Sequence, residues 1–250
     1  MELDIIHLKE IDSTNKYCYK LGKDGKRNLI VVSDVQTGGV GRLERKWYSD
    51  FGGLYFSILL DLEEFKKECK NDNIGKLNFL GSLSTYETLN CYLKDFKTVG
   101  CIGIKFPNDI IVNVENKDKK LSGILSEINI NYGFLVLGIG INVNNKIHDE
   151  IKDIATSLKE LEGKEFDRFE ILNKFIDNFK NNYYLNDDEV LKGYKKYSKT
   201  MGKYVKVITP KEEIKGTVFD IDYGGIHLAT SDGIKHISVG DCVHLRKDKR

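Results

Sequence analysis

The residues best suited to chemistry lie in the stretch 36–47, where glycines precede a run of cations. The stretch holds Gly38, Gly39, Gly41, Arg42, Arg45 and Lys46, and Trp47, the single tryptophan of the chain, ends it. Residues without a Cβ can present consecutive backbone N–H groups to an anion, and a planar guanidinium suits phosphate. The stretch therefore predicts a loop that binds a phosphate-bearing ligand; a flexible, solvated basic loop is the alternative interpretation.

A second candidate is Lys105, which lies between Ile104 and Phe106. A charged ammonium in such an apolar setting is costly unless it meets an anion, so Lys105 is a candidate charge stabiliser. A lysine at a strand edge that reaches water with its ammonium is the alternative. Pro107 interrupts the surrounding strand-like run, so the chain is expected to bend there.

Polar side chains also occur where a helical pattern begins. Ser13, Thr14 and Asn15 precede it, and they either cap the helix or face an anion at its N-terminus, where backbone N–H groups are free. In a later apolar stretch, Gly138 and Gly140 alternate with larger residues. Glycines at this spacing in a strand indicate the close approach of another backbone or of a ligand.

The elements that must position these residues follow from the apolar periodicity. Strands are predicted at 4–7, 29–35, 54–60, 103–112, 121–127 and 133–141, and helices at 13–22, 77–93, 157–184 and 189–197, the last one polar and covering. We expect a charged connection at 63–73 and a polar turn at 113–120. The basic glycine stretch thus lies between two strands, and the P-loop signature is absent, which excludes a Walker-type nucleotide site.

The pattern changes towards the C-terminus. Short alternating strands are predicted at 204–208, 214–221, 225–229, 234–239 and 242–245. This spacing is typical of a small β-barrel. We therefore place a domain boundary near Thr200 and expect domains at 1–199 and 200–250.

Composition limits the possible partners. The 250 residues include 39 basic and 38 acidic side chains, a net charge of +1, which argues against a general nucleic-acid binder and favours a small anionic ligand. The cysteines and histidines are scattered without metal-binding spacing, so reduced thiols and no metal centre are expected. No signal peptide and no apolar run of about 20 residues is visible, so we expect a cytoplasmic protein without a membrane partner.

Four segments occur in an order that strongly resembles the biotin protein ligases. They are Ser13-Thr14-Asn15, the stretch 36–47, residues 105–109 with 120–125, and residues 138–143. The resemblance spans nearly the whole chain and departs from the family pattern at three positions. Val40 replaces an arginine and Glu44 a glycine of the loop, and Phe106 replaces a common tryptophan.

The resemblance implies a fold and a reaction. The fold would be α+β: a class II synthetase-like ligase domain with a mixed β-sheet flanked by helices, and a small C-terminal SH3-like barrel. In the reaction, the carboxylate of biotin attacks the α-phosphorus of ATP, which gives biotinyl-5′-AMP and pyrophosphate. A lysine of a biotin carboxyl carrier domain then attacks the mixed anhydride, and AMP leaves. Biotin, ATP and Mg²⁺ are the implied small molecules.

The resemblance also implies roles for individual residues. Lys105 and Arg42 would be catalytic, because both steps gather negative charge around one phosphate and one carboxyl group. Biotin would contact Ser13, Thr14, Asn15, Gln36, Gly39, Val40, Gly41, Arg42, Lys105, Gly123, Gly138 and Gly140. ATP and the adenylate would contact Arg42, Arg45, Trp47, Lys105, Asn108 and Asn142, and Asp109 is a candidate outer-shell partner of Mg²⁺.

Two alternatives stay open. A lipoate-protein ligase or octanoyltransferase has a related fold and an equivalent lysine, although the glycine-arginine loop and the barrel favour biotin. A nucleic-acid or effector-binding module would place Arg42, Arg45 and Lys46 on phosphates, but the neutral net charge argues against it. Because the chain begins directly at the ligase region, we expect no upstream DNA-binding domain and no DNA partner. Edge strands near the site favour a homodimer.

Overall fold

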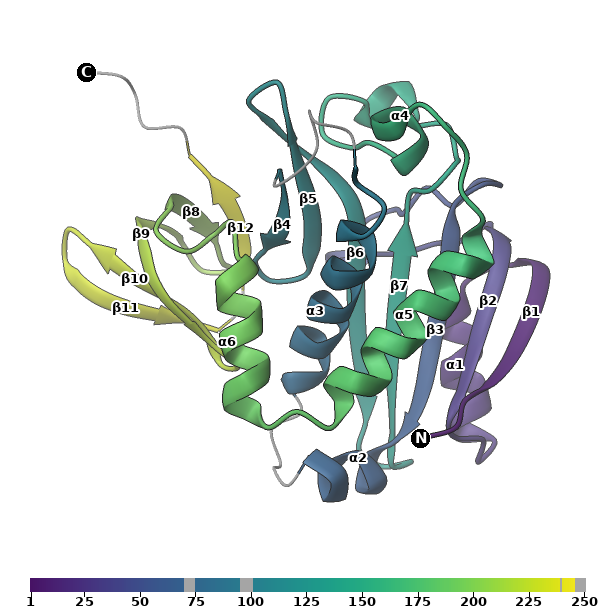
Figure 1. Cartoon of the computed structure of the whole chain (residues 1–250). Coiled ribbons are helices and arrows are strands. Elements are labelled where there is room, and N and C mark those ends of the chain that lie inside the picture. The colour runs from purple at the N-terminus through teal and green to yellow at the C-terminus, as the bar shows by residue number, and fades with distance from the viewer. Residues whose placement is uncertain (70–74, 95–100, 239, 246–250) are drawn as a thin grey trace.

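Seven strands form the larger of two sheets, in the order β1-β2-β3-β7-β6-β5-β4 (Figure 1). The computed structural model describes residues 1–69, 75–94, 101–238 and 240–245. The strands are β1 Asp4–Ile11, β2 Leu29–Gln36, β3 Leu54–Asp61, β4 Ile102–Lys105, β5 Asp109–Val114, β6 Lys117–Asn129 and β7 Phe134–Ile141. β1 and β2 are parallel and the other neighbours are antiparallel, so the predicted mixed sheet is confirmed.

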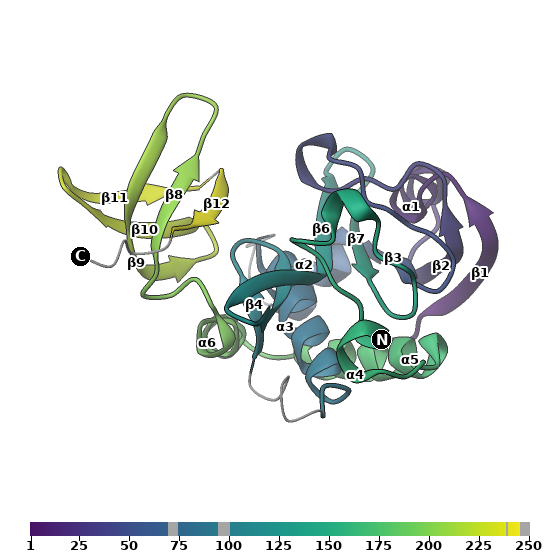
Figure 2. The ribbon, with the colours of Figure 1, turned by 90° about the horizontal axis from the view of Figure 1, so that it is seen from above.

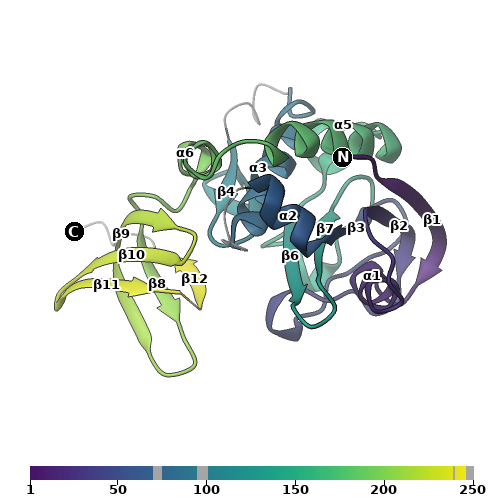
Figure 3. The ribbon, with the colours of Figure 1, turned by 90° about the horizontal axis from the view of Figure 1, so that it is seen from below.

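Helices cover both faces of this sheet. α1 (Thr14–Lys23) lies on one face, and α3 (Lys76–Asn90) and α5 (Arg168–Tyr183) lie on the other (Figures 2 and 3). Successive side chains of a strand point to opposite faces. In β2, Leu29 and Val31 therefore pack towards α1, whereas their neighbours join the larger core. Burial on both faces explains why this strand is apolar without alternation.

Two predicted connections are shorter than expected. Most of the charged connection predicted at 63–73 is the helix α2 (Leu62–Cys69), and the remainder lies outside the described residues. The polar turn predicted at 113–120 consists of Glu115 and Asn116, whose φ angles of 51° and 63° are left-handed. Such a pair forms the tight turns whose twist matches the flanking strands, so the pairing of β5 with β6 extends to Val114 and Lys117.

The C-terminal helices also differ from their predictions. The helix predicted at 157–184 is two helices, α4 (Leu158–Glu162) and α5, because Gly163 ends α4 with a left-handed φ of 69°. α6 (Asp187–Tyr197), predicted to be polar and covering, buries Tyr194 completely. No helix in the described part of the chain has the length and apolar composition that crossing a membrane requires.

The second sheet is antiparallel, has the order β11-β10-β9-β8-β12, and lies beside β4 and α6 (Figures 1 and 3). Its strands are β8 Tyr204–Ile208, β9 Glu213–Asp222, β10 Gly225–Thr230, β11 Gly233–Ile237 and β12 Asp241–His244. They agree closely with the predicted strands, except that Val239 lies outside the described residues. The closure of this sheet into a barrel and the domain boundary near Thr200 stay predictions.

The segment that leads into the second sheet covers the open edge of β4. Lys199 N donates to Ile104 O (2.8 Å), and Phe106 N donates to Thr200 Oγ1 (2.9 Å). The edge strand of a sheet leaves such backbone groups unpaired unless another segment covers them. The strand that carries Lys105 is therefore held on both sides, by β5 and by the start of the second sheet.

The contact between α1 and β7 depends on a glycine in the last turn of the helix. A Cβ on Gly22 would lie 2.8 Å from the ring of Phe134, a fully buried side chain. We expect Gly22→Ala to lower the free energy of unfolding by ~1–2 kcal/mol, because overpacking outweighs the gain in helix propensity. Urea denaturation measures this change.

Gly193→Ala in α6 is the matched control, because its Cβ would meet only the flexible end of Leu83, at 3.0 Å. This variant is expected to keep or slightly raise the free energy of unfolding, since alanine favours helix more than glycine does. An equal loss in both variants would contradict the role given to the contact between Gly22 and Phe134.

Candidate functional site

A cavity of about 410 Å³ opens between the glycine loop (residues 36–47), the turn from β4 to β5 and the second sheet. Pockets for small molecules have volumes in this range. The predicted site residues that line it are Ser13, Thr14, Asn15, Gln36, Val40, Gly41, Arg42, Arg45, Trp47, Lys105, Asn108, Gly123, Gly138, Gly140 and Asn142. Gly39 is the one predicted residue outside this lining. Segments distant in the chain thus meet at one cavity.

The glycine loop closes on itself through backbone hydrogen bonds. Trp47 N donates to Gly39 O (2.9 Å), and Gly41 N donates to Arg45 O (2.7 Å). A Cβ on Gly39 would lie 2.6 Å from both Trp47 O and Ser49 Oγ, so this glycine makes room for the loop itself. In this conformation the N–H of Gly41 donates its hydrogen bond within the loop, to Arg45 O, and not toward a phosphate.

The tip of the loop explains one departure from the family pattern. Leu43 and Glu44 both adopt left-handed backbone angles, with φ of 55° and 58°. Glycine enters this region freely, whereas a residue with a Cβ does so at a cost of roughly 1–2 kcal/mol. A glycine at position 44, as in the family pattern, would enter this region freely, whereas the glutamate adopts it against a steric penalty.

At one end of the cavity, polar side chains form a continuous hydrogen-bond network. Gln36 Oε1 accepts from the backbone N–H of Thr14 (2.8 Å) and from its hydroxyl (3.1 Å). Ser57 Oγ lies 2.7 Å from Thr14 Oγ1 and 2.6 Å from Asn15 Oδ1. Asn15 Nδ2 donates to Glu127 Oε2 (2.7 Å). The network fixes the direction of both carboxamides, as recognition of a polar ring requires.

The glycines of β7 make room for side chains of the chain itself. A Cβ on Gly138 would lie 1.9 Å from Asn15 Oδ1, and a Cβ on Gly140 would lie 2.5 Å from Trp47 Nε1. The close approach predicted from the alternation of these glycines is thus that of a carboxamide and an indole ring. Both groups reach the sheet surface only because no side chain stands there.

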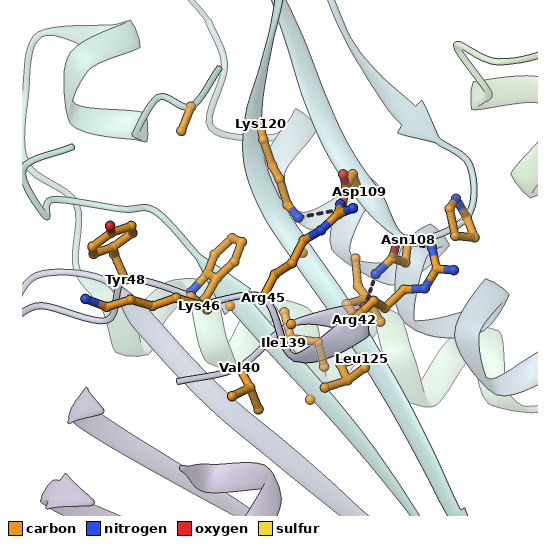
Figure 4. Close-up of a pocket in the computed structure, with 18 of the residues that line it drawn as sticks. Val40, Arg42, Arg45, Lys46, Tyr48, Asn108, Asp109, Lys120, Leu125 and Ile139 are labelled. Carbon is orange, nitrogen blue, oxygen red and sulfur yellow. Dashed lines mark hydrogen bonds and ion pairs between the residues drawn. The ribbon is translucent and has the colours of Figure 1, made fainter. Parts of the chain in front are cut away.

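Trp47 lies beneath an ion pair at the other end of the cavity. Lys120 Nζ is 2.6 Å from Asp109 Oδ1 (Figure 4). The same ammonium is 5.0 Å from the centroid of the Trp47 ring. The indole Nε1 of Trp47 is buried and has no hydrogen-bond partner within the described residues. A buried donor left unpaired costs about 1–3 kcal/mol, so an acceptor atom of a ligand at this point would be stabilised.

Arg42 connects the glycine loop to two other parts of the structure. Its guanidinium lies beside Asn108 (Figure 4), donating to Asn108 Oδ1 at 3.5 Å, and it also donates to Gly240 O at 3.2 Å. Asn108 is itself held in place, because its Nδ2 donates to Ile124 O at 2.5 Å. The second sheet also contributes apolar lining to the cavity, with Ile208, Cys242 and Val243. This sheet is therefore part of the wall of the site.

Lys105 lies between the cavity and the second sheet. It lines the cavity, and across the described ranges no carboxylate forms an ion pair with its ammonium. Burial lowers the pKa of His244, and the positive charge of Lys105 lowers it further. His244 Nε2 lies 3.0 Å from Thr200 Oγ1, the hydroxyl that accepts from Phe106 N. The ammonium of Lys105 thus lies near an imidazole whose pKa is lowered, with no carboxylate among the described residues to neutralise it.

Two predicted residues line the cavity while their side chains also serve the fold. Ser13 caps α1 by accepting from Lys16 N at 3.5 Å, as the capping alternative expected. Asn142 donates from Nδ2 to Thr156 O (3.1 Å) and accepts on Oδ1 from Asn145 Nδ2 (3.2 Å). The carboxamide of Asn142 is therefore engaged on both sides, which limits what it can offer to a ligand.

Sequence reasoning missed several side chains of the site, among them the polar groups of Lys120, Ser57 and Glu127. Lys120 belongs to the segment 120–125 that carries the family resemblance, but no role was given to it. Ser57 is a hydroxyl within an otherwise apolar strand, and that exception was the signal that could have found it. Glu127 lies near the end of β6, and the sequence around it gives no comparable signal.

Known proteins resemble this chain over nearly its whole length. Residues 8–144 match the Biotin/lipoate A/B protein ligase family, and residues 200–245 match the Biotin protein ligase C terminal domain. The biotin protein ligase of Aquifex aeolicus, solved in complex with biotin and ATP, has a TM-score of 0.80 and 34% identity, covering 98% of this chain and 99% of that chain. The bifunctional ligase/repressor BirA of Bacillus subtilis is 29% identical over 254 residues, 95% of this chain and 73% of its own length. With these matches and the confirmed fold, the chain belongs to the biotin protein ligase family.

Proposed function

We propose that this chain is an ATP-dependent biotin protein ligase, which forms biotinyl-5′-AMP and transfers biotin to a lysine of a biotin carboxyl carrier domain. The observation that carries the proposal is a cavity with a fixed polar network at one end and arginines and lysines at the other. Biotin has a polar ureido ring and a carboxylate at opposite ends, and ATP brings phosphates. The membership of the family and the neighbour solved with biotin and ATP support the same assignment.

The polar end of the cavity would hold the ureido ring of biotin. Its carboxamides and hydroxyls offer donors and acceptors whose directions are set by the network described above. The side chains proposed to hydrogen-bond the ring are Ser13, Thr14, Asn15 and Gln36. The residues proposed to enclose biotin without side-chain polarity are Gly39, Val40, Gly41, Gly123, Gly138 and Gly140.

The cationic end would stabilise the charge that develops in both steps. Lys105 would bind the carboxylate of biotin and the α-phosphate, because no carboxylate within the described residues neutralises it. Arg42 would hold the phosphate of the adenylate. Lys120 adds a further cation beside Trp47, with its charge balanced by Asp109 until an anionic substrate enters.

The nucleotide would lie at the cationic end of the same cavity. Arg45 would position the phosphates of ATP in the first step, and Trp47 would cover the nucleotide. Asn108 and Asn142 would frame the ribose or the adenine. Mg²⁺ would enter with the polyphosphate as part of the substrate, and Asp109, 2.6 Å from Lys120, would be its outer-shell partner.

Closure of the glycine loop would shield the mixed anhydride from water until the carrier lysine arrives. For self-association we propose a homodimer through β1, because β1 and β4 are the outer strands of the large sheet and β4 is covered by the segment before β8. An uncovered edge offers backbone groups that a second copy could pair. The reduced thiols of Cys18 and Cys91 support a reducing, cytoplasmic location.

Transfer of labelled biotin to a purified carrier domain, in the presence of ATP and Mg²⁺, tests the function. We expect labelling that requires ATP and that disappears when the acceptor lysine of the carrier is replaced by arginine. Lipoate and octanoate, each offered with a lipoyl domain, serve as the competing substrates. Preferential transfer of either one would overturn the proposal in favour of the related ligases.

Lys105→Ala is expected to reduce both partial reactions by roughly 10²-fold or more while the fold is kept, because a fixed cation at the reacting groups is lost. Pyrophosphate release measures the first step, and single-turnover transfer from added biotinyl-AMP measures the second. Lys119→Ala is the matched control, since Lys119 Nζ donates a hydrogen bond to Lys152 O and Lys119 lies outside the cavity lining. Normal adenylate formation by Lys105→Ala contradicts the role.

The same assays separate two roles for Lys120. If its ammonium only balances Asp109, the double variant Lys120→Ala, Asp109→Asn recovers the activity that Lys120→Ala alone loses, because no unpaired carboxylate then repels the substrate. We expect no recovery, since Lys120 lines the cavity and its charge would lie beside the substrate phosphate. Asp109→Asn alone is the control for the loss of the proposed Mg²⁺ partner. Full recovery would restrict Lys120 to a charge-balancing role.

Arg42→Gly is expected to release biotinyl-AMP into solution, because the variant loses the guanidinium that would hold the adenylate phosphate. The measurement is biotin labelling of lysines on a bystander protein that the enzyme does not recognise. Arg45→Ala is the comparison, and it is expected to slow pyrophosphate release without bystander labelling. Bystander labelling that stays at the wild-type level in Arg42→Gly would contradict this account of the loop.

A further inference from the structure

Three potential metal ligands meet on the second sheet, outside the cavity. Asp222 stands at the end of β9, His227 in β10 and His236 in β11, and none of them lines the cavity. One ligand atom from each lies within 4.8 Å of the other two. The scattering of the histidines along the chain predicted no metal centre, but dispersal along the chain says nothing about neighbours across a sheet.

Backbone pairing brings the three side chains together. His227 and His236 are directly opposite each other in the antiparallel pair β10–β11, and their rings stack with centroids 4.4 Å apart. Asp222 is paired with Gly225 at the turn from β9 to β10, and its Oδ1 accepts from Gly224 N at 2.7 Å. The ladder and the turn thus fix all three side chains without help from a ligand.

Both imidazoles direct the same ring nitrogen at the carboxylate. His227 Nε2 lies 2.6 Å from Asp222 Oδ2, and His236 Nε2 lies 3.4 Å from Asp222 Oδ1. Within the described residues, no lysine or arginine forms an ion pair with Asp222, whereas the nearby Asp220 is paired with Lys195 at 2.6 Å. Among the described residues, the carboxylate of Asp222 therefore forms ion pairs with the two histidines alone.

We propose that Asp222, His227 and His236 bind one divalent transition-metal ion of the Zn²⁺ class, with water in the remaining position. Zinc takes imidazole nitrogen and carboxylate oxygen at about 2.0–2.2 Å, and tetrahedral bonds of that length place donor atoms about 3.3–3.5 Å apart. The separation of 3.4 Å between His236 and Asp222 already suits this geometry. His227 Nε2 lies 2.6 Å from the other oxygen, Oδ2, so this contact has to lengthen and the carboxylate has to turn for one oxygen to share the ion with both imidazoles.

Binding also requires a change of protons. A ring nitrogen binds a metal only without its proton, so each imidazole would bind as the neutral tautomer with its proton on Nδ1, and any proton displaced from Nε2 would pass to the solvent. The metal then replaces a hydrogen bond between the same atoms. Because the ligands come from β9, β10 and β11, the ion would clamp three strands, and its effect would be on the stability of the second sheet rather than on the ligase chemistry.

Isothermal titration of the full chain, free of any affinity tag, with ZnCl₂ tests the site. We expect one equivalent to bind and the thermal midpoint to rise with zinc concentration, because the ion binds the folded state. Asp222→Asn and His236→Ala are each expected to weaken binding at least tenfold. His148→Ala is the matched control, since His148 forms a comparable surface pair with Asp50 at 2.5 Å.

Substitution by Co²⁺ gives a second readout, because tetrahedral cobalt absorbs strongly in the visible range and that signal reports the donor set directly. It is expected in the wild type and in His148→Ala, and absent in His236→Ala. Absence of zinc binding to the wild type would overturn the proposal. So would binding that persists in the Asp222 and His236 variants, or that is abolished by alkylating the cysteines. Circular dichroism checks that each variant is folded.

Discussion

The position of the proposed catalytic ammonium depends on how the open edge of β4 is covered. Lys199 and Thr200 occupy the backbone groups of Ile104 and Phe106, so the residue between them cannot move independently of the second sheet. The same Thr200 hydroxyl contacts His244 of β12. The contacts that cover the unpaired edge of β4 therefore also hold Lys105 at the wall of the cavity.

The cavity combines two kinds of polar environment that are built differently. At one end, Thr14, Asn15 and Gln36 are locked by hydrogen bonds to other side chains, so their dipoles are oriented before a ligand enters. At the other end, long cationic side chains from the glycine loop and β6 meet carboxylate and carbonyl partners. Fixed dipoles suit the recognition of a neutral ring, whereas adjustable cations suit a reaction in which charge moves between phosphate and carboxyl groups.

Much of this was predictable from sequence, for physical reasons. The apolar strands, the capping residue Ser13 and the glycine loop are local patterns, and local patterns specify local structure. What could not be predicted depends on pairing between distant segments. The register of β6 against β7 sets where Lys120 lies, and the approach of Asn15 and Trp47 to Gly138 and Gly140 needs the folded sheet. The pairing of His227 with His236 could not be predicted either, because it also depends on the register of two strands.

The left-handed backbone at Glu44 has a consequence for the energetics of loop closure. A glycine at this position would sample many more backbone conformations in the open loop than a glutamate does. The glutamate therefore has less conformational entropy to lose when the loop becomes ordered over a ligand. The steric penalty at φ 58° is present in the loop conformation described above, so the two effects oppose each other. In the proposed closure, the residue at the tip of the loop would thus act through its backbone rather than through a contact with the substrate.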